Sequence, residues 1–466
     1  MATVRQKSLK REYLSLIVAV LILFDLMTGA QMTRWTNWAG TATAVPRRVH
    51  KPRSTPELAE VVANAAVEGR KIRPWGSGHS FTPICVAESD AVDLTNWTGV
   101  ASADVTTGLV TVRSGTTLKV LNAELDHLGL GLINLGDIDA QTVAGAISTG
   151  THGTGARLGG LATQVAALEI VLADGSVVHC SADHRPDLFA AARVGLGALG
   201  VISTVTLQCE KAFCLSAQER PEPLEQVLES FDELAASNDH YEFYWFPYGS
   251  NALVKQNNRL PAGTECQPLS KARQFLDYEI MENVAFGSFC RIGRAMPRLV
   301  QPLGRIASSS LSSREYSDVS HRVFVTHRAV KFVESEFAVP RESLHDVLAE
   351  LRALVPTLEN PVMFPVEVRV AAADDIWLST ANGRDSAYIA IHQYVGMPYR
   401  EYFASFASIV GQVGGRPHWG KMHDLDASTL RERYPHFDDF LQIRKEVDPA
   451  GVFTNAYLDQ VLGPVA

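Results

Sequence analysis

Two glycine-rich segments constrain the fold of this chain more than any other feature. The first, RPWGSGHSFTP, spans residues 73–83 and presents one histidine, His79, among small residues. The second, NLGDIDAQTVAGAISTGTHGTGARLGG, spans residues 134–160 and is mostly Gly, Ala, Ser and Thr. Such segments let backbone amides approach a bound group closely, often a phosphate, although either one alone is more typical of a tight turn. Neither fits GxGxxG or GxxxxGK[ST], which disfavours an ordinary Rossmann or P-loop site.

The length and composition predict a globular enzyme with more than one domain. The chain has 466 residues, 46% of them hydrophobic and 20% charged, which is enough for two or three cores. A net charge of -9 argues against nucleic acid as a partner. The six cysteines form no CxxC pair and no zinc spacing. We therefore expect the cysteines to act as small apolar residues of a protein in a reducing compartment, with disulfides as the less favoured alternative.

The N-terminus carries an apolar run that covers only Leu16–Phe24. This run is shorter than the roughly 20 residues that cross a bilayer. One interpretation is the core of a signal peptide that ends in small residues at Thr28–Ala30. The other, which we favour, is an upstream start codon with the protein beginning at Met32, because the sequence that follows is typical of a cytosolic enzyme. We expect a cytoplasmic protein and leave association with a membrane open.

Local signals predict α+β structure in both halves of the chain. A helix begins at Ser54 or Thr55 and ends at Gly69, and Asp174-Gly175 marks the turn of a hairpin. An α+β domain therefore extends to about residue 212. Beyond it, further helices and strands alternate around a segment of helix and irregular cover, and one of the predicted strands covers residues 323–340.

Three short motifs in the second half contain polar residues suited to chemistry. In PVEVRVAAAD, Glu367 and Arg369 are two apart in a predicted strand, so they share one face and can grip a hydroxylated substrate or form a surface ion pair. In GRPHWGKMH, His418 and Lys421 stand close together, but no third ligand at a sensible spacing supports a metal site, and we expect none. His392 lies in the predicted strand IAIHQYVG, where a buried, hydrogen-bonded histidine is the usual explanation.

Together, GSGHS, STGTHGTG, VEVR and HWGK resemble the sugar-1,4-lactone and alditol oxidases of the vanillyl-alcohol-oxidase flavoprotein superfamily. The resemblance runs from about Trp35 to Leu462 and is nearest to bacterial L-gulono- and D-arabinono-1,4-lactone oxidoreductases. It implies an α+β, two-domain flavoprotein with an FAD-binding domain of the PCMH (vanillyl-alcohol oxidase) type and an α+β substrate or cap domain. The implied division is an extension over 1–34, the FAD domain over 35–212, the cap domain over 213–440, and a return to the FAD domain over 441–466.

The resemblance also implies FAD, bound covalently through a nitrogen of His79 to the 8α-methyl of the flavin. An oxidised flavin can present an electrophilic methide there, and the attachment raises its potential. The residues implied to contact the cofactor are Pro74, Trp75, Gly76, Ser77, Gly78, His79, Ser80, Gly136, Asp137, Thr142, Val143, Ala144, Gly145, Thr149, Gly150, Thr151, His152, Val201, Ile202 and His418.

The implied reaction is oxidation of an aldono-1,4-lactone at the carbinol beside its carbonyl, with hydride passing to flavin N5. Arg369 and Lys421 then stabilise developing negative charge, Glu367 orients hydroxyls, and His392 is a candidate base. The electrons pass to O2 or to another acceptor such as a cytochrome or a quinone. An alditol oxidase, or a flavin-binding protein without turnover, is the alternative, although a protein without turnover has no need of the three charged pocket residues.

Two positions in NLGDID bear on the choice of substrate and acceptor. Alditol oxidases carry a serine where this chain has Asp137, which favours a lactone over an open-chain polyol. Gly136 matches a glycine of oxygen-using lactone oxidases, where a methyl group can obstruct the path of O2 to the flavin. The alternative interpretation is that Gly136 only supplies a positive φ in a turn.

Overall fold

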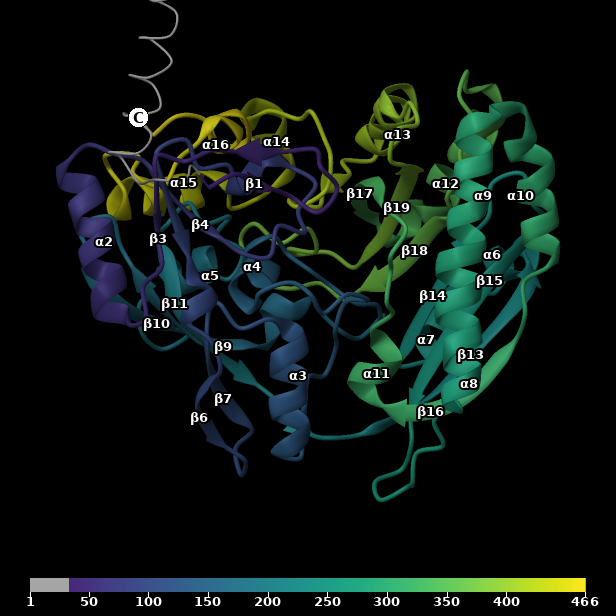
Figure 1. Cartoon of the computed structure of the whole chain (residues 1–466), viewed down its shortest axis with the longest axis horizontal. Coiled ribbons are helices and arrows are strands. Elements are labelled where there is room, and N and C mark those ends of the chain that lie inside the picture. The colour runs from purple at the N-terminus through teal and green to yellow at the C-terminus, as the bar shows by residue number, and fades with distance from the viewer. Residues whose placement is uncertain (1–32, 466) are drawn as a thin grey trace, which may run out of the picture.

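The computed structural model describes residues 33–465. Figure 1 shows two α+β domains, the N-terminal domain on the left and the second on the right, which confirms the predicted fold class. The two interpretations of the N-terminal extension, a signal peptide or an upstream start, concern residues 1–32 and lie outside the described residues. Within residues 33–465, no helix is both long and apolar enough to cross a bilayer.

The N-terminal domain contains a parallel sheet in the order β3–β5–β4. Helix α2 (Thr55–Val67) connects the two outer strands of this sheet, and its start follows the predicted signals. The hydroxyl of Ser54 accepts a hydrogen bond from the amide of Glu57, and Pro56 stands in the first turn. The strands are β3 (Arg48–His50), β4 (Ile72–Trp75) and β5 (Asp90–Asp93).

An antiparallel sheet in the order β10–β9–β11–β7–β6 completes the framework of this domain. Asp174 and Gly175, the latter at φ +81°, form the predicted turn between β9 and β10. Helices α3 (Leu118–His127), α4 (Val143–Ser148) and α5 (Pro186–Ala192) accompany the sheet. The strands are β6 (Val100–Asp104), β7 (Leu109–Arg113), β9 (Val165–Val171), β10 (Val177–Ser181) and β11 (Val201–Gln208).

The second domain is built on an eight-stranded antiparallel sheet in the order β16–β13–β15–β14–β18–β19–β17–β20. Its core includes side chains of α6 (Leu224–Glu229), α7 (Phe231–Ser237), α12 (Leu344–Leu354) and α13 (Arg400–Gln412). The strands are β13 (Cys214–Pro223), β14 (His240–Trp245), β15 (Asn251–Arg259), β16 (Arg314–Val319), β17 (Phe332–Pro340), β18 (Val366–Ala371), β19 (Ser386–Tyr394) and β20 (Arg416–Pro417).

The strand expected over residues 323–340 is wrong in its first half. Only β17 is extended, while α11 (Ser320–Phe324) precedes a loop over residues 325–331. Other segments provide hydrogen-bond partners for the backbone of this loop, and for this reason its apolar residues do not continue the strand. The amide of Thr326 donates to the carbonyl of Asp137 at 3.0 Å, and the Asn283 side chain bonds the backbone at His327 and Ala329.

The last helices of the chain return to the N-terminal domain, where Figure 1 shows them in yellow at the top, near β1 (Trp35–Thr36) and above β4. The amide of Ile72 in β4 donates to the carbonyl of Val452 at 2.8 Å. The Asn455 side chain donates to three carbonyl oxygens of residues 83–86 at 3.0 to 3.2 Å. The helices are α14 (Ala427–Arg433), α15 (Phe437–Val447) and α16 (Ala456–Leu462).

One pair of cysteines corrects the expectation that all six act as small apolar residues. Cys214 and Cys266 form a disulfide, with their Cα atoms 6.0 Å apart. The pairing of β13 with β15 brings them together, because Cys214 begins β13 and Cys266 lies in the loop that follows β15. The other four thiols are free. Burial raises the pKa of Cys209 to about 12, so this thiol stays protonated and acts as an inert apolar side chain.

A half-buried histidine, His423, fixes the C-terminal helices to the chain before them. Nδ1 of His423 accepts from the amide of Leu425 at 3.3 Å, so the neutral ring carries its proton on Nε2. That nitrogen lies 3.0 Å from the hydroxyl of Tyr457, which in turn donates to the carbonyl of Trp419 at 3.2 Å. Burial lowers the pKa of His423 from its ordinary value of 6.5 to about 4.

This lowered pKa predicts a loss of stability in mild acid. Between pH 6.5 and about 4 the unfolded chain binds a proton at residue 423 that the folded chain does not. The free energy of unfolding therefore falls with pH in this window, by about 2 kcal/mol between pH 7 and 5. His423→Gln should remove this part of the pH dependence in urea unfolding at a fixed cofactor content. His179→Gln, at an exposed histidine, is the control, and equal pH slopes in both variants would contradict the prediction.

Candidate active site

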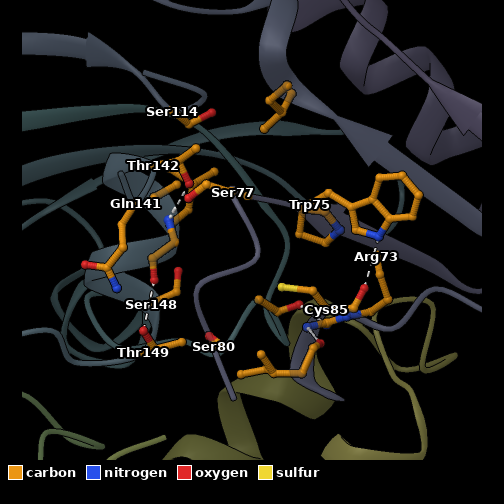
Figure 2. Close-up of a pocket in the computed structure, with 18 of the residues that line it drawn as sticks. Arg73, Trp75, Ser77, Ser80, Cys85, Ser114, Gln141, Thr142, Ser148 and Thr149 are labelled. Atoms are coloured by element: carbon orange, nitrogen blue, oxygen red, sulfur yellow. Dashed lines mark hydrogen bonds between the residues drawn. The ribbon is translucent and has the colours of Figure 1, made fainter. Parts of the chain in front are cut away.

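A first cavity of about 790 Å³ lies in the N-terminal domain, next to the carboxyl end of β4. Figure 2 shows Gln141, Thr142, Ser148 and Thr149 on one side of this cavity and Trp75 with Cys85 on the other. Its lining contains no Asp or Glu. The cavity is therefore suited to a long ligand that carries negative charge and a flat apolar group.

Backbone amides in the first glycine-rich segment are free to bind such a ligand. Within the described part of the chain, the amides of Ser77, Gly78, His79 and Ser80 donate to no protein acceptor. Consecutive free amides of this kind form an anion-binding concavity. Gly78 has φ +73° and a Cβ there would lie 3.2 Å from the ring of Trp35, so the turn requires glycine.

A second unpaired group supports the same assignment. The hydroxyl of Ser114 lines the first cavity and is buried without a hydrogen-bond partner among the described residues. A buried hydroxyl is normally paired, and a ligand in this cavity would supply the missing partner. The lining residues and these unpaired groups fit the phosphates and the ring of FAD.

A second cavity of about 820 Å³ lies between the two domains. Trp38, Phe81 and Phe332 form an apolar part of its wall, while the rest of the lining is rich in charged side chains. The two cavities share four lining residues, which are His79, Ser80, Gln141 and Thr149. A ligand seated in the first cavity can therefore reach the second by passing His79.

The His79 ring at this junction is held against an aromatic neighbour. It stacks on Trp38, with ring centres 5.9 Å apart and planes inclined by 23°. Burial and the nearby charge of Lys421 lower the pKa of His79. The ring is therefore neutral near pH 7, and a neutral imidazole keeps a lone pair on one nitrogen.

The VEVR motif supplies an ion-pair network on one face of β18. Glu367 and Arg369 line the second cavity, while Val366, Val368 and Val370 pack into the apolar core, as the alternation predicts. Arg369 forms an ion pair with Glu367, and its Nε donates to Glu242 at 2.8 Å. Tyr244 donates its hydroxyl proton to Glu367 at 2.6 Å.

Two carboxylates of this network differ in their pKa values. Burial raises the pKa of Glu367, and the neighbouring Arg369 offsets this effect only in part. Burial also acts on Asp137, but Arg328 and Arg369 together hold the pKa of its carboxyl well below the usual range. Arg328 forms an ion pair with Asp137, and Arg369 lies 3.6 Å from it. The cavity thus places a fixed negative charge beside two guanidinium groups.

Lys421 of the HWGK motif also lines the cavity and forms an ion pair with Glu334 of β17. Burial opposes the charge on Lys421, but Glu334 and Glu336 raise its pKa, so it stays cationic. His392 does not line the cavity. Its Nδ1 lies 3.1 Å from the carbonyl of Pro365, and its Nε2 is 3.5 Å from Glu334, which stands between His392 and the cavity.

His152, Glu336 and His418 have ligand-type atoms within 4.8 Å of one another in the second cavity. Their hydrogen bonds disfavour a metal ion. Nδ1 of His418 accepts from the amide of Gly420 at 3.0 Å, so the neutral ring carries its proton on Nε2 and has no second lone pair. His152 donates from Nδ1 to the carbonyl of Gly153 and presents Nε2 to Glu336 at 3.1 Å, so only these two of the three residues could offer a ligand atom.

The structure divides the residues that the sequence singles out between the two cavities. Val143, Gly150 and His392 line neither cavity. Those that line the second cavity are His79, Ser80, Gly136, Asp137, Thr149, Thr151, His152, Glu367, Arg369, His418 and Lys421. Those that line the first are Pro74, Trp75, Gly76, Ser77, Gly78, His79, Ser80, Thr142, Ala144, Gly145, Thr149, Val201 and Ile202.

Sequence reasoning missed several residues of the site. Glu334 and Glu336 alternate in VESEF just as Glu367 and Arg369 do in VEVR, and this period of two could have indicated them. Arg328 stands in the loop that was predicted as strand, where no periodicity marks it. The other missed residues of the two cavities and the network include Trp38, Arg73, Phe81, Ser114, Gln141, Glu242, Tyr244 and Phe332.

Comparison with known proteins confirms the resemblance that the motifs indicate. A model of an FAD binding domain matches residues 46–181, and a model of D-arabinono-1,4-lactone oxidase matches residues 205–461. L-gulono-1,4-lactone dehydrogenase of Mycobacterium tuberculosis is 43% identical over 430 residues, which cover 92% of this chain and 99% of that protein. L-gulonolactone oxidase of Mus musculus is 36% identical over 447 residues, which cover 94% and 100%.

A solved structure supports the fold independently. The crystal structure of cholesterol oxidase from B. sterolicum superposes with a TM-score of 0.78 at 17% identity, covering 92% of this chain and 96% of that one. At this identity the likeness concerns the architecture alone. With the family model covering more than half of the residues, this chain belongs to the D-arabinono-1,4-lactone oxidase family of FAD-dependent oxidoreductases.

Proposed function

We propose that this enzyme oxidises an aldono-1,4-lactone, of the L-gulono or D-arabinono type, at the carbinol beside the carbonyl. The observation that carries the proposal is the meeting of the two cavities at His79. An anion-binding cavity suited to FAD opens there into a cavity lined by Arg369, Lys421 and Glu367. The relatives named above act on sugar lactones, and this pocket has the groups that a small hydroxylated lactone needs.

The cofactor would be held mainly by backbone. The free amides of residues 77–80 would bind the phosphates, and Ser114 would gain its missing hydrogen bond. When bound, FAD supplies the two-electron acceptor for a hydride from the substrate. His79, neutral and stacked on Trp38, would carry the covalent attachment because its imidazole keeps a lone pair for bond formation. O2 or another acceptor, such as a cytochrome or a quinone, would receive the electrons.

The charged side chains of the second cavity would orient the substrate. Arg369 and Lys421, both held cationic by their carboxylate neighbours, would donate to the lactone carbonyl and stabilise negative charge on the reacting oxygen. Glu367 would accept hydrogen bonds from hydroxyl groups, with Tyr244 fixing its orientation. His392 stands behind Glu334, so it would receive the hydroxyl proton only through that carboxylate.

A panel of aldonolactones and alditols, assayed with oxygen and with a dye acceptor, tests the reaction. We expect turnover of lactones in preference to alditols. Arg369→Ala or Lys421→Ala should lower kcat/KM by about two orders of magnitude or more, roughly 3 kcal/mol of transition-state stabilisation, at normal flavin content.

Arg431→Ala is the matched control, because its guanidinium lies outside both cavities, where it pairs with Asp438 at the surface and stands over the ring of Phe437. Preference for alditols would make the enzyme an alditol oxidase, and no turnover with any substrate would leave a flavin-binding protein. Near-normal kcat/KM in both pocket variants would make VEVR and HWGK structural elements only.

The covalent attachment has a direct test. After acid precipitation of the holoenzyme, the yellow colour should stay with the pellet, and in His79→Ala it should pass to the supernatant. The exposed His179→Ala should behave like the wild type. Flavin wholly in the wild-type supernatant would show that FAD is bound without a covalent bond.

Access of oxygen to the cofactor depends on Gly136 in this proposal. Its φ is not positive, so the alternative that glycine serves a left-handed turn is wrong. Gly136 lines the second cavity, and a Cβ there would lie 3.2 Å from both the His152 carbonyl and the Thr151 methyl group.

Gly136→Ala should therefore lower oxygen turnover at least about tenfold and leave dye turnover within a few-fold, as an oxygen electrode and a dye assay can measure. Gly131→Ala is the control. Gly131 lies outside both cavities, and a Cβ there would be 3.5 Å or more from its neighbours, which is ordinary van der Waals contact. Equal losses with oxygen and dye would indicate damaged backbone geometry instead.

A further inference from the structure

A helical hairpin on the second domain exposes an unusual amount of apolar surface. We call it the outer hairpin; Figure 1 shows α9 and α10 at the side of the second domain remote from the N-terminal domain. Seven of the fourteen large exposed hydrophobic side chains of the described chain lie in residues 275–306. The hairpin spans residues 271–309 and consists of α8 (Lys271–Gln274), the π-helical segment η4 (Phe275–Ala285), α9 (Phe286–Ala295), a turn over residues 296–299 and α10 (Val300–Ser309).

The two faces of α9 have distinct roles. Gly287, Cys290 and Gly293 are buried at every third position and turn toward the domain. A Cβ at Gly293 would lie 2.9 Å from Val300 of α10, so the two helices approach closely on this inner side. Ile292 is 43% exposed on the other side of α9, and all seven exposed apolar side chains lack a covering element among the described residues.

The seven exposed side chains belong to every part of the outer hairpin except α8. The least exposed are 41% and the most exposed 62% accessible. They are aliphatic, methionine and phenylalanine side chains, with neither Trp nor Tyr among them. They are Phe275, Leu276, Met281, Val284, Ile292, Met296 and Ile306.

The charge of this segment is opposite to that of the whole chain. Residues 271–309 contain six Lys or Arg and three carboxylates, whereas the complete chain has a net charge of -9. The carboxylates, Asp277, Glu279 and Glu282, contact Arg273, His327 and Arg314, and from Asn283 to Ser313 there is no Asp or Glu. This stretch contains four exposed arginines, and none has a carboxylate within ion-pair distance among the described residues. They are Arg291, Arg294, Arg298 and Arg305.

We propose that the outer hairpin docks this protein on the surface of an anionic lipid bilayer. Its apolar side chains would enter the boundary between headgroups and acyl chains, and the four arginines would bind lipid phosphates. Each basic side chain near an anionic surface adds about 1 kcal/mol of attraction. Because the remainder of the protein is acidic and repelled by the same lipids, only this face would turn toward the bilayer.

The same features disfavour two other occupants of the surface. A second copy of the chain would meet it through a two-fold axis, which sets the unpaired arginines of both copies against each other. An acidic protein would satisfy the arginines only by burying its carboxylates beside the exposed apolar side chains, and Asp and Glu are depleted at the cores of protein interfaces. An anionic bilayer fits both the apolar side chains and the charge.

The hairpin is also linked to the wall of the second cavity. The Asn283 side chain donates to the carbonyl of His327 at 3.0 Å and accepts from the amide of Ala329 at 2.7 Å. These two bonds fix the loop that carries Arg328 into the cavity. A docked hairpin would therefore hold one wall of this cavity close to the membrane surface. The proposal itself does not rest on the identity of the substrate.

Sedimentation of the full-length holoenzyme with vesicles tests the proposal. Binding should be strong on phosphatidylcholine mixed with phosphatidylglycerol, weak on phosphatidylcholine alone, and weakened by salt. Ile292→Asp with Ile306→Asp, or Arg291→Glu with Arg298→Glu, should lower the vesicle partition coefficient at least about tenfold. Flavin content and turnover of a soluble substrate should stay unchanged, since none of these residues lines a cavity.

Matched controls elsewhere on the surface keep the test specific. Val67→Asp with Val120→Asp replaces two exposed valines of the N-terminal domain, and Arg53→Glu with Lys71→Glu makes the same change of net charge. Both controls should bind vesicles like the wild type. The proposal is overturned if hairpin and control variants bind equally, if neutral vesicles bind as well as anionic ones, or if the hairpin variants change only the oligomeric state.

Discussion

The buried guanidinium of Arg73 connects the segments on which the first cavity depends. It donates to carbonyl oxygens of Ile84, Leu196, Gly197 and Phe453 at 2.6 to 3.0 Å. Burial lowers its pKa only to about 10, so it remains charged at neutral pH. Five donors in a fixed fork make arginine suited to this position, and a shorter cation could not reach all four oxygens at once.

The charged side chains of the second cavity share ion-pair partners, so the loss of one side chain affects several others. Arg369 contacts Glu367, Glu242 and Asp137, and the last of these also pairs with Arg328. Removing one member of such a set leaves others buried without a partner, which costs more than the pair contributes. The arrangement therefore holds its side chains in fixed positions before a substrate arrives, and this rigidity suits a reaction that needs a defined distance between substrate and cofactor.

Much of the site follows from local sequence pattern, and the remainder follows from contacts that no local pattern contains. The alternation in VEVR places Glu367 and Arg369 on one face because a strand has a period of two. Residues 325–331 resemble a strand, yet hydrogen bonds with the Asn283 side chain and the carbonyl of Asp137 hold them as a loop and bring Arg328 to the cavity. The disulfide likewise depends on the register of β13 against β15, which the positions of the cysteines in the sequence do not reveal.

The return of the chain end to β4 has a consequence for folding. Arg73 bonds Phe453 across 380 residues, and Ile72 bonds Val452 beside it. Contacts at such separation form late, because the long intervening loop must first close. During synthesis, these contacts beside the first cavity are missing until the last residues of the chain leave the ribosome. Completion of the chain thereby secures the strand that leads into the first glycine-rich segment.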